Sequence, residues 1–555
     1  MSRQPVTVEA PAGSSLPEGR VAPAAPDGDR AITLIPSAAY VETELAAEYG
    51  RVPPAFLPVG HRRLYELQLQ VVGADSKVWL SLPASFKVPE TDRAWLERAG
   101  VRILQIPDGL TLSDSLRFAL DLIGEIGAGL RILHGDTLIL DAPLARTDVV
   151  AVGEPQDGYA WGRLSALDGD ADPNRVLAGY FAFSDVAEFR RCLCMAQGSF
   201  LDAVARYHRV HPLAEVRVGR WLDFGHLQTY YRARCGVSIQ REFNELDIDF
   251  RRIRKSGRDG AKIRAEADWF EHLPASLRSY TPALLGQGLR SDGRPWYSLE
   301  YLPLPTLHEL YVFGSLASGT WRGILGACAE FLVDCRQTAR AMSGAPVAGE
   351  PALRDLIARK TDERLGAFLR QRGMSAGARW RYAGTPLPPL EEIARITAQA
   401  VGGDPARHRS IVHGDFCFTN IFYDFRTQRV RVIDPRGSLD GRHNSVLGDW
   451  RYDLAKLSHS LVGGYDHILA GRYRLEGFDE RDARLEFPED DAFGRQRELA
   501  DAIVVESMTP WDTEIIAIVV HLFLSMLPLH SDRPDRQRAF LANALRLFHD
   551  HFVRR

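Results

Sequence analysis

Continuous apolar runs of strand length alternate with helix-like segments along the first part of the chain. The runs are AITLIP (31–36), KVWLSLP (77–83), VRILQIP (101–107), LRILHGDTLIL (130–140) and DVVAVGE (148–154). Runs that are apolar at every position are typical of strands buried on both faces of a sheet. Between the third and fourth runs, residues 113–127 place Leu116, Ala119, Leu120 and Ile123 on one helical stripe. This alternation predicts a three-layer α/β domain.

The chain is too long for a single core. At roughly 150 residues per domain, 555 residues predict two to four domains. Residues 1–30 are rich in Pro, Ala and Gly, which predicts a disordered leader and no signal peptide. The α/β pattern extends over 31–235, a small β-rich part with one helix over 236–305, and a mostly helical part over 306–555. The sequence therefore predicts an α/β domain followed by a bilobal α+β domain.

Composition limits the expected partners. A net charge of −4 without a long run of Lys and Arg predicts no nucleic acid partner, so small molecules are expected instead. The longest apolar stretch, 515–529, contains a His and is too short to span a bilayer comfortably, which predicts a buried helix and no membrane span. The six scattered cysteines form no C-x-x-C pair and predict reduced thiols in a cytoplasmic protein.

The tripeptide His-Gly-Asp occurs twice, each time at the end of an apolar run. In the second copy, IVHGDFCFTNIFYD, Asn420 follows Asp415 by five positions, and Asp434 follows the next apolar run in VRVIDPRG. Mg²⁺ prefers oxygen ligands, so an amide and a carboxylate from adjacent strand ends can hold it against ATP phosphates. Asp415 can then orient an attacking hydroxyl group, as in protein kinases. Each residue alone also fits a structural turn, but the three in this order predict a phosphoryl-transfer site.

Residues 236–555 resemble the aminoglycoside phosphotransferase and choline kinase family through the motifs HGDFCFTN, VIDPRG and GDWRYDLAKL. The resemblance implies a protein-kinase-like fold and the use of ATP and Mg²⁺. It implies that Asp415 orients the substrate hydroxyl group and accepts its proton, and that Asn420 and Asp434 bind Mg²⁺. It also implies that Asp453 supports the catalytic loop by hydrogen bonds, while Asp449 either does the same or contacts the metal.

Further upstream, the same resemblance implies a nucleotide-binding lobe. Lys255 in FRRIRKSG would contact the ATP phosphates and pair with Glu266 on the next helix. The nearby cations Arg252, Arg254 and Lys262 are competitors for that role. The segment YSLEYLPLPTL resembles the hinge between lobes, where the backbone from Glu300 to Leu302 would meet adenine.

The first His-Gly-Asp, in RILHGDTLI, has no Asn five residues later and lies in the α/β part. An apolar strand that ends in Gly-Asp resembles the metal-binding strand of sugar-nucleotide nucleotidyltransferases. AGYFAF (178–183) is similar to their sugar-contacting strand, and WLDFG (221–225) to the segment with their second metal-binding Asp. The resemblance implies that Asp136 and Asp223 share a cation that bridges nucleotide phosphates.

This part also departs from that family. The expected Gly-rich, Arg-bearing loop is replaced by a stretch without Gly before Gly50, and Pro53-Pro54-Ala55 lacks the expected Lys. The glutamates of this stretch oppose the binding of a triphosphate; they are Glu42, Glu44 and Glu48. Only three arginines offer compensation: Arg51, Arg62 and Arg63. We therefore predict a nucleotidyltransferase-like domain without standard nucleotidyl transfer, which binds a nucleotide or a sugar nucleotide.

Together, the two resemblances predict an ATP-dependent kinase that phosphorylates a hydroxyl group of a sugar or amino-alcohol. The fusion resembles proteins of bacterial capsule and surface-polysaccharide biosynthesis. One alternative is a bifunctional kinase and nucleotidyltransferase. Another is a non-catalytic pseudokinase joined to a sugar-nucleotide-binding module, against which the retention of Asp415, Asn420 and Asp434 argues.

Overall fold

The computed structural model describes residues 31–73, 76–124, 127, 129–155, 161–162, 175–237, 244–342, 352–375, 377–439, 445–488 and 493–554. The leader predicted for residues 1–30 lies outside this part. The chain divides into two compact units, residues 1–239 and 240–555. The boundary predicted from the sequence was between residues 235 and 236.

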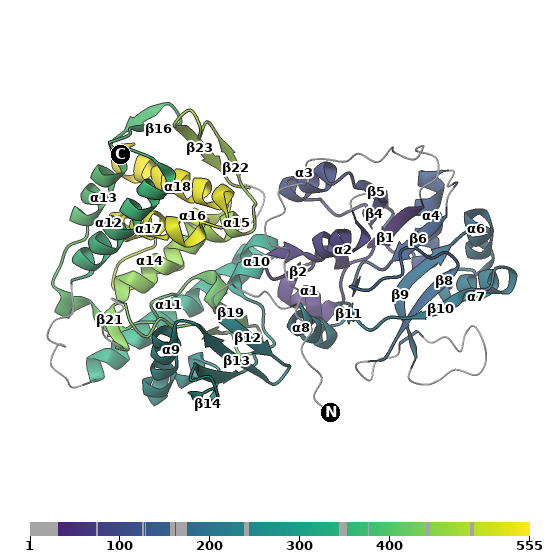
Figure 1. Cartoon of the computed structure of the whole chain (residues 1–555), viewed down its shortest axis with the longest axis horizontal. Coiled ribbons are helices and arrows are strands. Elements are labelled where there is room, and N and C mark those ends of the chain that lie inside the picture. The colour runs from purple at the N-terminus through teal and green to yellow at the C-terminus, as the bar shows by residue number, and fades with distance from the viewer. Residues whose placement is uncertain are drawn as a thin grey trace. The chain divides into compact units, whose positions relative to one another are not determined.

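The N-terminal unit is built on a seven-stranded mixed sheet (Figure 1). In spatial order the strands are β10 (Ala214–Arg217), β8 (Val149–Gly153), β9 (Val176–Phe183), β6 (Leu130–Leu133), β1 (Ile32–Pro36), β4 (Lys77–Pro83) and β5 (Arg102–Ile106). β1, β4, β5 and β6 run parallel to one another. β9 is antiparallel to both of its neighbours, and β10 is parallel to β8.

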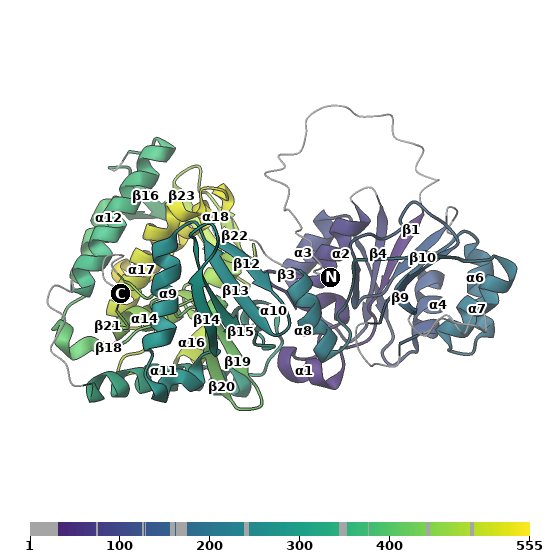
Figure 2. The ribbon, with the colours of Figure 1, turned by 60° about the horizontal axis from the view of Figure 1, so that its bottom comes forward.

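Helices cover both faces of this sheet. On one face lie α4 (Leu112–Ile123), α6 (Val186–Met195) and α7 (Phe200–Val210), whose buried side chains share one hydrophobic core with the strands. On the other face lie α2 (Leu64–Val72) and α3 (Glu90–Arg98) (Figures 1 and 2). The unit also contains α1 (Thr43–Tyr49), α8 (Leu227–Gly236) and the short strands β2 (Pro58–Val59) and β3 (Arg62–Arg63). The alternation of strands and helices in the sequence thus corresponds to a layered α/β unit.

The fourth apolar run is not one strand. It divides at the first His-Gly-Asp into β6 and β7 (Thr137–Ile139), and β7 leaves the main sheet to pair with β11 (Trp221–Asp223). A Cβ on Gly135 would lie 2.7 Å from the carbonyl oxygen of Pro36, so the chain can turn here only because residue 135 has no side chain. The turn places Thr137 opposite Asp223.

The C-terminal unit begins with a four-stranded antiparallel sheet and one helix. The spatial order is β12 (Asn244–Ile248), β13 (Arg252–Gly257), β15 (Pro295–Glu300) and β14 (Leu284–Leu289). The helix α9 (Gly260–His272) follows β13 and is capped by Asp259, whose carboxylate accepts a hydrogen bond from the backbone N–H of Lys262. α9 packs against β13, β14 and β15, so residues of β13 and α9 face each other.

The rest of this unit is mostly helical (Figure 1). Its helices are α10 (Leu307–Phe313), α11 (Ser318–Ala341), α12 (Leu353–Arg372), α13 (Leu390–Gln399), α14 (Trp450–Leu461), α15 (Tyr465–Leu469), α16 (Gln496–Ala500), α17 (Thr513–Met526) and α18 (Pro534–Phe548). Small strands at its periphery are β16 (Trp380–Tyr382), β17 (Thr385–Leu387), β22 (Arg474–Glu476) and β23 (Asp482–Glu486).

α17 forms the centre of the helical part, in contact with α12, α13, α14 and α18. Every side chain from Ile515 to Met526 is buried. Within the described residues, Thr513–His530 is long and apolar enough to cross a membrane by length and composition alone, and 72% of it is buried inside the protein. The buried helix predicted for residues 515–529 is therefore present.

Two short hairpins carry the loops of the second His-Gly-Asp motif. β18 (Arg409–Ile411) pairs with β21 (Leu447–Asp449), and β19 (Ile421–Asp424) pairs with β20 (Arg429–Val432). The loop after β20 closes onto α9 at Gly437, where a Cβ would lie only 2.0 Å from the carbonyl oxygen of Ala265. This close approach joins the small β-rich lobe to the helical lobe.

Gly437→Ala should destabilise the protein more than the matched change Gly373→Ala. Both glycines have a positive φ, +64° and +61°, at which an L side chain costs about 1–2 kcal/mol. A Cβ at position 437 would also collide with Ala265, whereas nothing lies within 4 Å of one at position 373. We expect a lower melting temperature for both variants and a clearly larger decrease for Gly437→Ala, measured by thermal unfolding of the full chain. Equal decreases would contradict the close approach.

Candidate active site

A buried carboxylate supports the loop that carries Asp415 through hydrogen bonds to its backbone. Asp453, on the first turn of α14, accepts hydrogen bonds from the backbone N–H groups of His413 (2.6 Å) and Gly414 (2.8 Å). Burial raises the pKa of Asp453 to about 7, against the effect of these two hydrogen bonds. The supporting role expected for Asp453 is therefore what the structure shows. Asp449 instead caps α14 and pairs with Arg451 (2.5 Å).

Asn420 and Asp434 lie at the ends of the paired strands β19 and β20. The side-chain N–H group of Asn420 donates to the backbone oxygen of Asp415 (3.0 Å) and to its carboxylate (3.3 Å). The backbone oxygen of Asn420 accepts a hydrogen bond from Ile433 N–H (3.0 Å), which places Asp434 next in the chain. Asp434 has a φ of +57°, a left-handed conformation that Asp tolerates better than most residues. The three residues predicted from spacing alone therefore converge.

Lys255 completes this group from the other lobe. Its Nζ lies 2.7 Å from Glu266 and 3.0 Å from Asp434, and the hydroxyl group of Tyr297 donates to Glu266 (2.7 Å). The Lys255 and Glu266 side chains are almost fully buried. Burial would lower the pKa of Lys255, but the charges of Asp434 and Glu266 outweigh it and raise the pKa. Lys255 is therefore held as a cation beside the predicted metal ligands.

Of the competing cations near Lys255, the two arginines are engaged elsewhere, and Lys262 lies farther from Glu266 than Lys255 does. Arg252 pairs with Asp249 on the protein surface (3.4 Å), and Arg254 lies over the ring of Trp296. Lys262 is half exposed and its Nζ lies 3.8 Å from Glu266. The Lys255 ammonium group contacts Asp434 directly, at 3.0 Å.

The predicted hinge residues lie at the end of β15, the strand beside β13. The backbone N–H of Glu300 donates to Ala283 (3.0 Å), and its exposed carboxylate lies 3.7 Å from Arg431. Leu302 is buried directly after the strand. The structure thus places the segment on the sheet that carries Lys255.

Asp415 contacts two cations that the sequence reasoning did not identify. Lys456 Nζ lies 2.8 Å from its carboxylate and the Arg436 guanidinium 3.9 Å from it. Burial would raise the pKa of Asp415, but the charges of Lys456 and Arg436 outweigh it and hold the pKa well below its usual range. A signal was present in GDWRYDLAKL, since Lys456 follows Asp453 by three residues and therefore shares its helix face.

The donor set fits a magnesium ion. The amide N–H of Asn420 donates to Asp415, and its amide oxygen, 3.5 Å from the Thr419 hydroxyl group, is the atom that would bind the ion. Asp434 offers a carboxylate that is 37% exposed. Mg²⁺ binds one or two protein oxygen ligands together with phosphates and water, so this small set suffices. Within the described residues no cluster of three or more His, Cys, Asp or Glu side chains is present.

In the N-terminal unit, the structure brings Asp136 and Asp223 together. A Cβ on Gly225 would lie 2.9 Å from the carboxylate of Asp136 and 3.4 Å from that of Asp223. Thr229 donates a hydrogen bond to Asp223 (2.5 Å). Burial, and then the charge of Asp136, raise the pKa of Asp223 to about 6. Two carboxylates that repel each other at the end of β7 and β11 are consistent with a shared cation.

The surroundings of this pair differ from a basic phosphate site. The carboxylate of Glu42 lies 3.0 Å from His226, and the hydroxyl group of Tyr231 donates to Glu48. Arg63, one of the arginines expected to compensate, is buried and pairs with Asp92 (3.2 Å).

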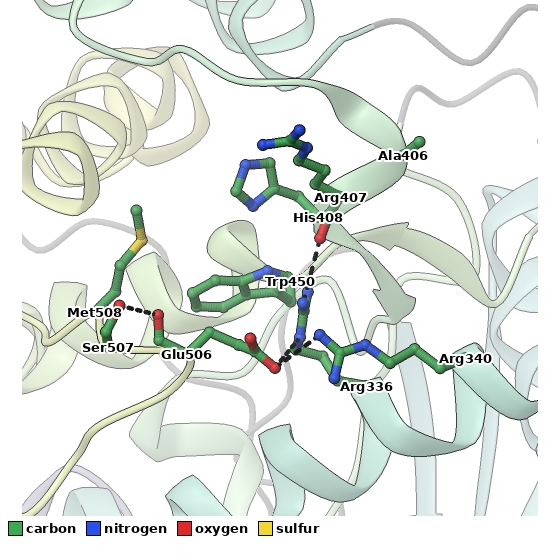
Figure 3. Close-up of a pocket in the computed structure, with 9 residues that line it drawn as sticks. All are labelled: Arg336, Arg340, Ala406, Arg407, His408, Trp450, Glu506, Ser507 and Met508. Carbon is green, nitrogen blue, oxygen red and sulfur yellow. Dashed lines mark hydrogen bonds and ion pairs between the residues drawn. The ribbon is translucent and has the colours of Figure 1, made fainter.

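A cavity of about 470 Å³ lies elsewhere in the C-terminal unit (Figure 3). Arg336 and Arg340 both reach into it toward Glu506, at 3.1 and 3.0 Å. Trp450, the first residue of α14, lies beside them, and Arg336 stacks over its ring. None of the predicted site residues lines this cavity. Its two arginines share one carboxylate, and the cavity is separate from the loop of Asp415.

Residues 250–487 match the sequence profile of the phosphotransferase enzyme family, and no curated protein matches the chain. The C-terminal unit therefore contains a phosphotransferase-family region. Similar solved structures include the GDP complex of wild-type aminoglycoside 2'-phosphotransferase-IIIa, with 13% identity, a TM-score of 0.34 and coverage of 57% of this chain and 92% of that chain. Another is a thermostable mutant of aminoglycoside phosphotransferase APH(4)-Ia in a ternary complex with AMP-PNP and hygromycin B. It has 13% sequence identity and a TM-score of 0.35, and the match covers 57% of this chain and 93% of that chain. The profile match includes every residue proposed for the C-terminal site and does not extend into the N-terminal unit.

The ion pair at the centre of the phosphotransferase region can be tested by a double-mutant cycle. We expect Asp415→Asn and Lys456→Met to show a coupling of about 1–3 kcal/mol in the free energy of unfolding at pH 7. Because the pKa of Asp415 is depressed on folding, its stabilisation is present above the unfolded-state value of about 3.9 and is lost as the pH falls below it. Chemical unfolding of the single and double variants gives the coupling, and a value near zero would show that the contact contributes nothing.

Proposed function

We propose that the C-terminal unit is an ATP- and Mg²⁺-dependent phosphotransferase that phosphorylates a hydroxyl group of a small molecule. The observation that carries this proposal is the convergence of Asp415, Asn420, Asp434 and Lys255 in the region that matches the phosphotransferase family. Phosphoryl transfer requires positioning and charge stabilisation more than covalent chemistry, and these side chains can supply both.

In the proposed reaction the acceptor oxygen bonds to the γ-phosphorus of ATP, the bond from that phosphorus to the β,γ-bridging oxygen breaks, and ADP leaves. Asp415 accepts a hydrogen bond from the acceptor hydroxyl group and orients it. Its low pKa makes it a weak base, so the proton stays on the carboxylate briefly and passes to solvent. Lys255, held by Glu266, binds the ATP phosphates. Bound Mg²⁺ supplies charge neutralisation there, and Asn420 and Asp434 are the residues that would hold it.

We further propose a sugar or an amino-alcohol as the acceptor, in bacterial surface-polysaccharide biosynthesis in the cytoplasm. Support comes from the resemblance of one half to small-molecule kinases and of the other to sugar-nucleotide nucleotidyltransferases. All six cysteines are free, which fits a reducing compartment. ATP consumption screened against sugars, aminosugars, choline, ethanolamine and glycerol derivatives tests the acceptor class.

For the N-terminal unit we propose nucleotide or sugar-nucleotide binding through a cation shared by Asp136 and Asp223. The convergence of these carboxylates on Gly225 supports the cation. The pairing of Arg63 with Asp92 argues against nucleotidyl transfer, because it removes a cation from a site that must bind a triphosphate. A bifunctional kinase and nucleotidyltransferase is the alternative.

Asp415→Asn should lower kcat by about 10²–10⁴ and leave the affinity for ATP nearly unchanged, because Asp415 orients the acceptor and does not bind the nucleotide. Steady-state kinetics with an acceptor from the screen, together with calorimetry of ATP binding, measure both effects. Turnover near that of the wild type would remove Asp415 from the mechanism. A wild-type protein without turnover on any acceptor would favour the non-catalytic alternative.

Asp434→Ala should abolish Mg²⁺-dependent ATP binding and leave the fold intact, because its partly exposed carboxylate contributes more to the ion than to the core. Asp424→Ala, at the far end of the same hairpin, serves as the matched control. Calorimetry with and without Mg²⁺ measures the effect, and circular dichroism checks the fold. Unchanged MgATP affinity in the Asp434 variant would contradict the assignment.

The N-terminal unit should release no pyrophosphate from any nucleoside triphosphate, with sugar phosphates or with the kinase product as acceptor. Each missing charge-assisted phosphate contact costs about 1.5–3 kcal/mol, so the loss of two or three slows transfer by orders of magnitude. A coupled pyrophosphate assay measures this, with Asp136→Ala as the control variant. Robust release that Asp136→Ala abolishes would establish the bifunctional alternative.

A further inference from the structure

Four cations lie around Asp415, on the side where the acceptor would approach it in the proposed reaction. They are Lys360, Arg364, Arg436 and Lys456. Lys456 and Arg436 contact Asp415 directly, and the Arg436 guanidinium also lies 3.4 Å from the hydroxyl group of Tyr452. Lys360 and Arg364, on α12, lie close enough to Arg436 and Tyr452 for their charges to interact.

The two residues of α12 are linked to the loop of Asp415. Lys360 donates a hydrogen bond to the backbone oxygen of Leu439. A Cβ on Gly414 would lie 3.0 Å from both Leu439 and Arg436, so this part of the chain packs against the residue that precedes Asp415. One turn further along α12, Arg364 donates to the backbone oxygen of Ser525 (3.3 Å).

The charges of these four cations affect one another and the nearby phenol of Tyr452. Burial lowers the pKa of Lys360; Tyr452 opposes this effect, and the charges of Arg436, Arg364 and Lys456 add to it. Burial would raise the pKa of the Tyr452 phenol, but the surrounding cations outweigh it and lower the pKa. The cations around Tyr452 thus create a positive local potential.

Carboxylates of the described residues do not balance this potential. Lys456 already neutralises Asp415, and Asp453 uses its two oxygens on backbone N–H groups. Glu363, which attracts Arg364, is exposed to solvent. The separate cavity at Trp450 differs, because its arginines reach Glu506 directly. Within the described part of the chain, the surroundings of Asp415 thus contain more cations than carboxylates that pair with them.

We propose that the acceptor phosphorylated by the C-terminal unit is an anion, which carries a phosphate or carboxylate group besides its reacting hydroxyl group. This inference rests on the proposed phosphotransferase function and, of the two acceptor classes proposed above, favours a sugar that carries an anionic group over a cationic amino-alcohol. The anionic group would bind between Lys360, Arg364 and Arg436, and the hydroxyl group would then approach Asp415. A polycationic acceptor would meet repulsion from the same side chains. Lys456 already neutralises the negative charge of Asp415, so a cationic acceptor is not needed to do so.

The binding test uses inorganic phosphate, with the nucleotide site filled by MgAMP-PNP. We expect calorimetry to show phosphate binding to the wild type and a loss of about tenfold or more in affinity for Lys360→Met and for Arg364→Met, because each removes a charge-assisted contact. Methionine retains the apolar stem, and Arg364→Lys should recover part of the affinity. Arg370→Met, exposed on the same helix, should bind as the wild type does. No binding to the wild type, or equal binding to all variants, overturns the proposal.

The kinetic test compares acceptors of similar size that carry different charges. One set is glucose, glucose 6-phosphate, glucuronate and glucosamine; the other is glycerol, glycerol 3-phosphate, glycerate and ethanolamine. We expect the best anionic member to exceed the neutral one about tenfold or more in kcat/KM, and this preference to fall in Lys360→Met with the KM for MgATP unchanged. The phosphate and carboxylate members show which anionic group is preferred.

A neutral or cationic acceptor as the best substrate overturns the inference and leaves the phosphotransferase function standing. Failure of MgAMP-PNP to bind contradicts the phosphotransferase function itself.

Discussion

The C-terminal site depends on one buried carboxylate, that of Asp453. It accepts hydrogen bonds from two consecutive backbone N–H groups, at His413 and Gly414, and so fixes the direction in which the next residue, Asp415, projects. A buried carboxylate is costly unless its oxygens are used, and these two bonds use them. Since Asp453 lies on α14, the same helix that positions the loop also delivers Lys456 to Asp415. Removing Asp453 would therefore disturb both the geometry and the charge of the site.

A second set of contacts joins the small lobe to this loop. Lys255 reaches from β13 to Glu266 on α9 and to Asp434 on the loop, and Gly437 on that loop approaches Ala265 of α9 without room for a side chain. The ion pairs and the steric contact connect the same helix to the same loop. A shift of α9 would separate Lys255 from Asp434, so the positions of these two residues are coupled by packing rather than by sequence proximity.

Spacing along the sequence was sufficient to identify the group formed by Asp415, Asn420 and Asp434, because short antiparallel hairpins bring strand ends together whatever the rest of the fold. The layered α/β unit also followed from its apolar runs. The spacing of Lys456 from Asp453 places both on one helix face, but the contact of Lys456 with Asp415 depends on how α14 packs against a loop about 40 residues earlier in the chain. The burial of Arg63 against Asp92 also depends on tertiary packing and could not be predicted from local sequence. Local pattern predicts which groups lie at strand ends, and tertiary packing decides which charges face them.

The two copies of His-Gly-Asp show how far the same tripeptide can diverge. In both copies the glycine lies where a side chain would collide, against Pro36 in one case and against Arg436 and Leu439 in the other, so each turn exposes its aspartate at the end of an apolar strand. The partners then differ. Asp136 lies near a second carboxylate, that of Asp223, and its charge raises the pKa of Asp223. Asp415 instead contacts Lys456, which supplies its counter-charge from within the protein. The same local backbone thus presents a carboxylate in both units, while the residues packed against it decide which charges that carboxylate meets.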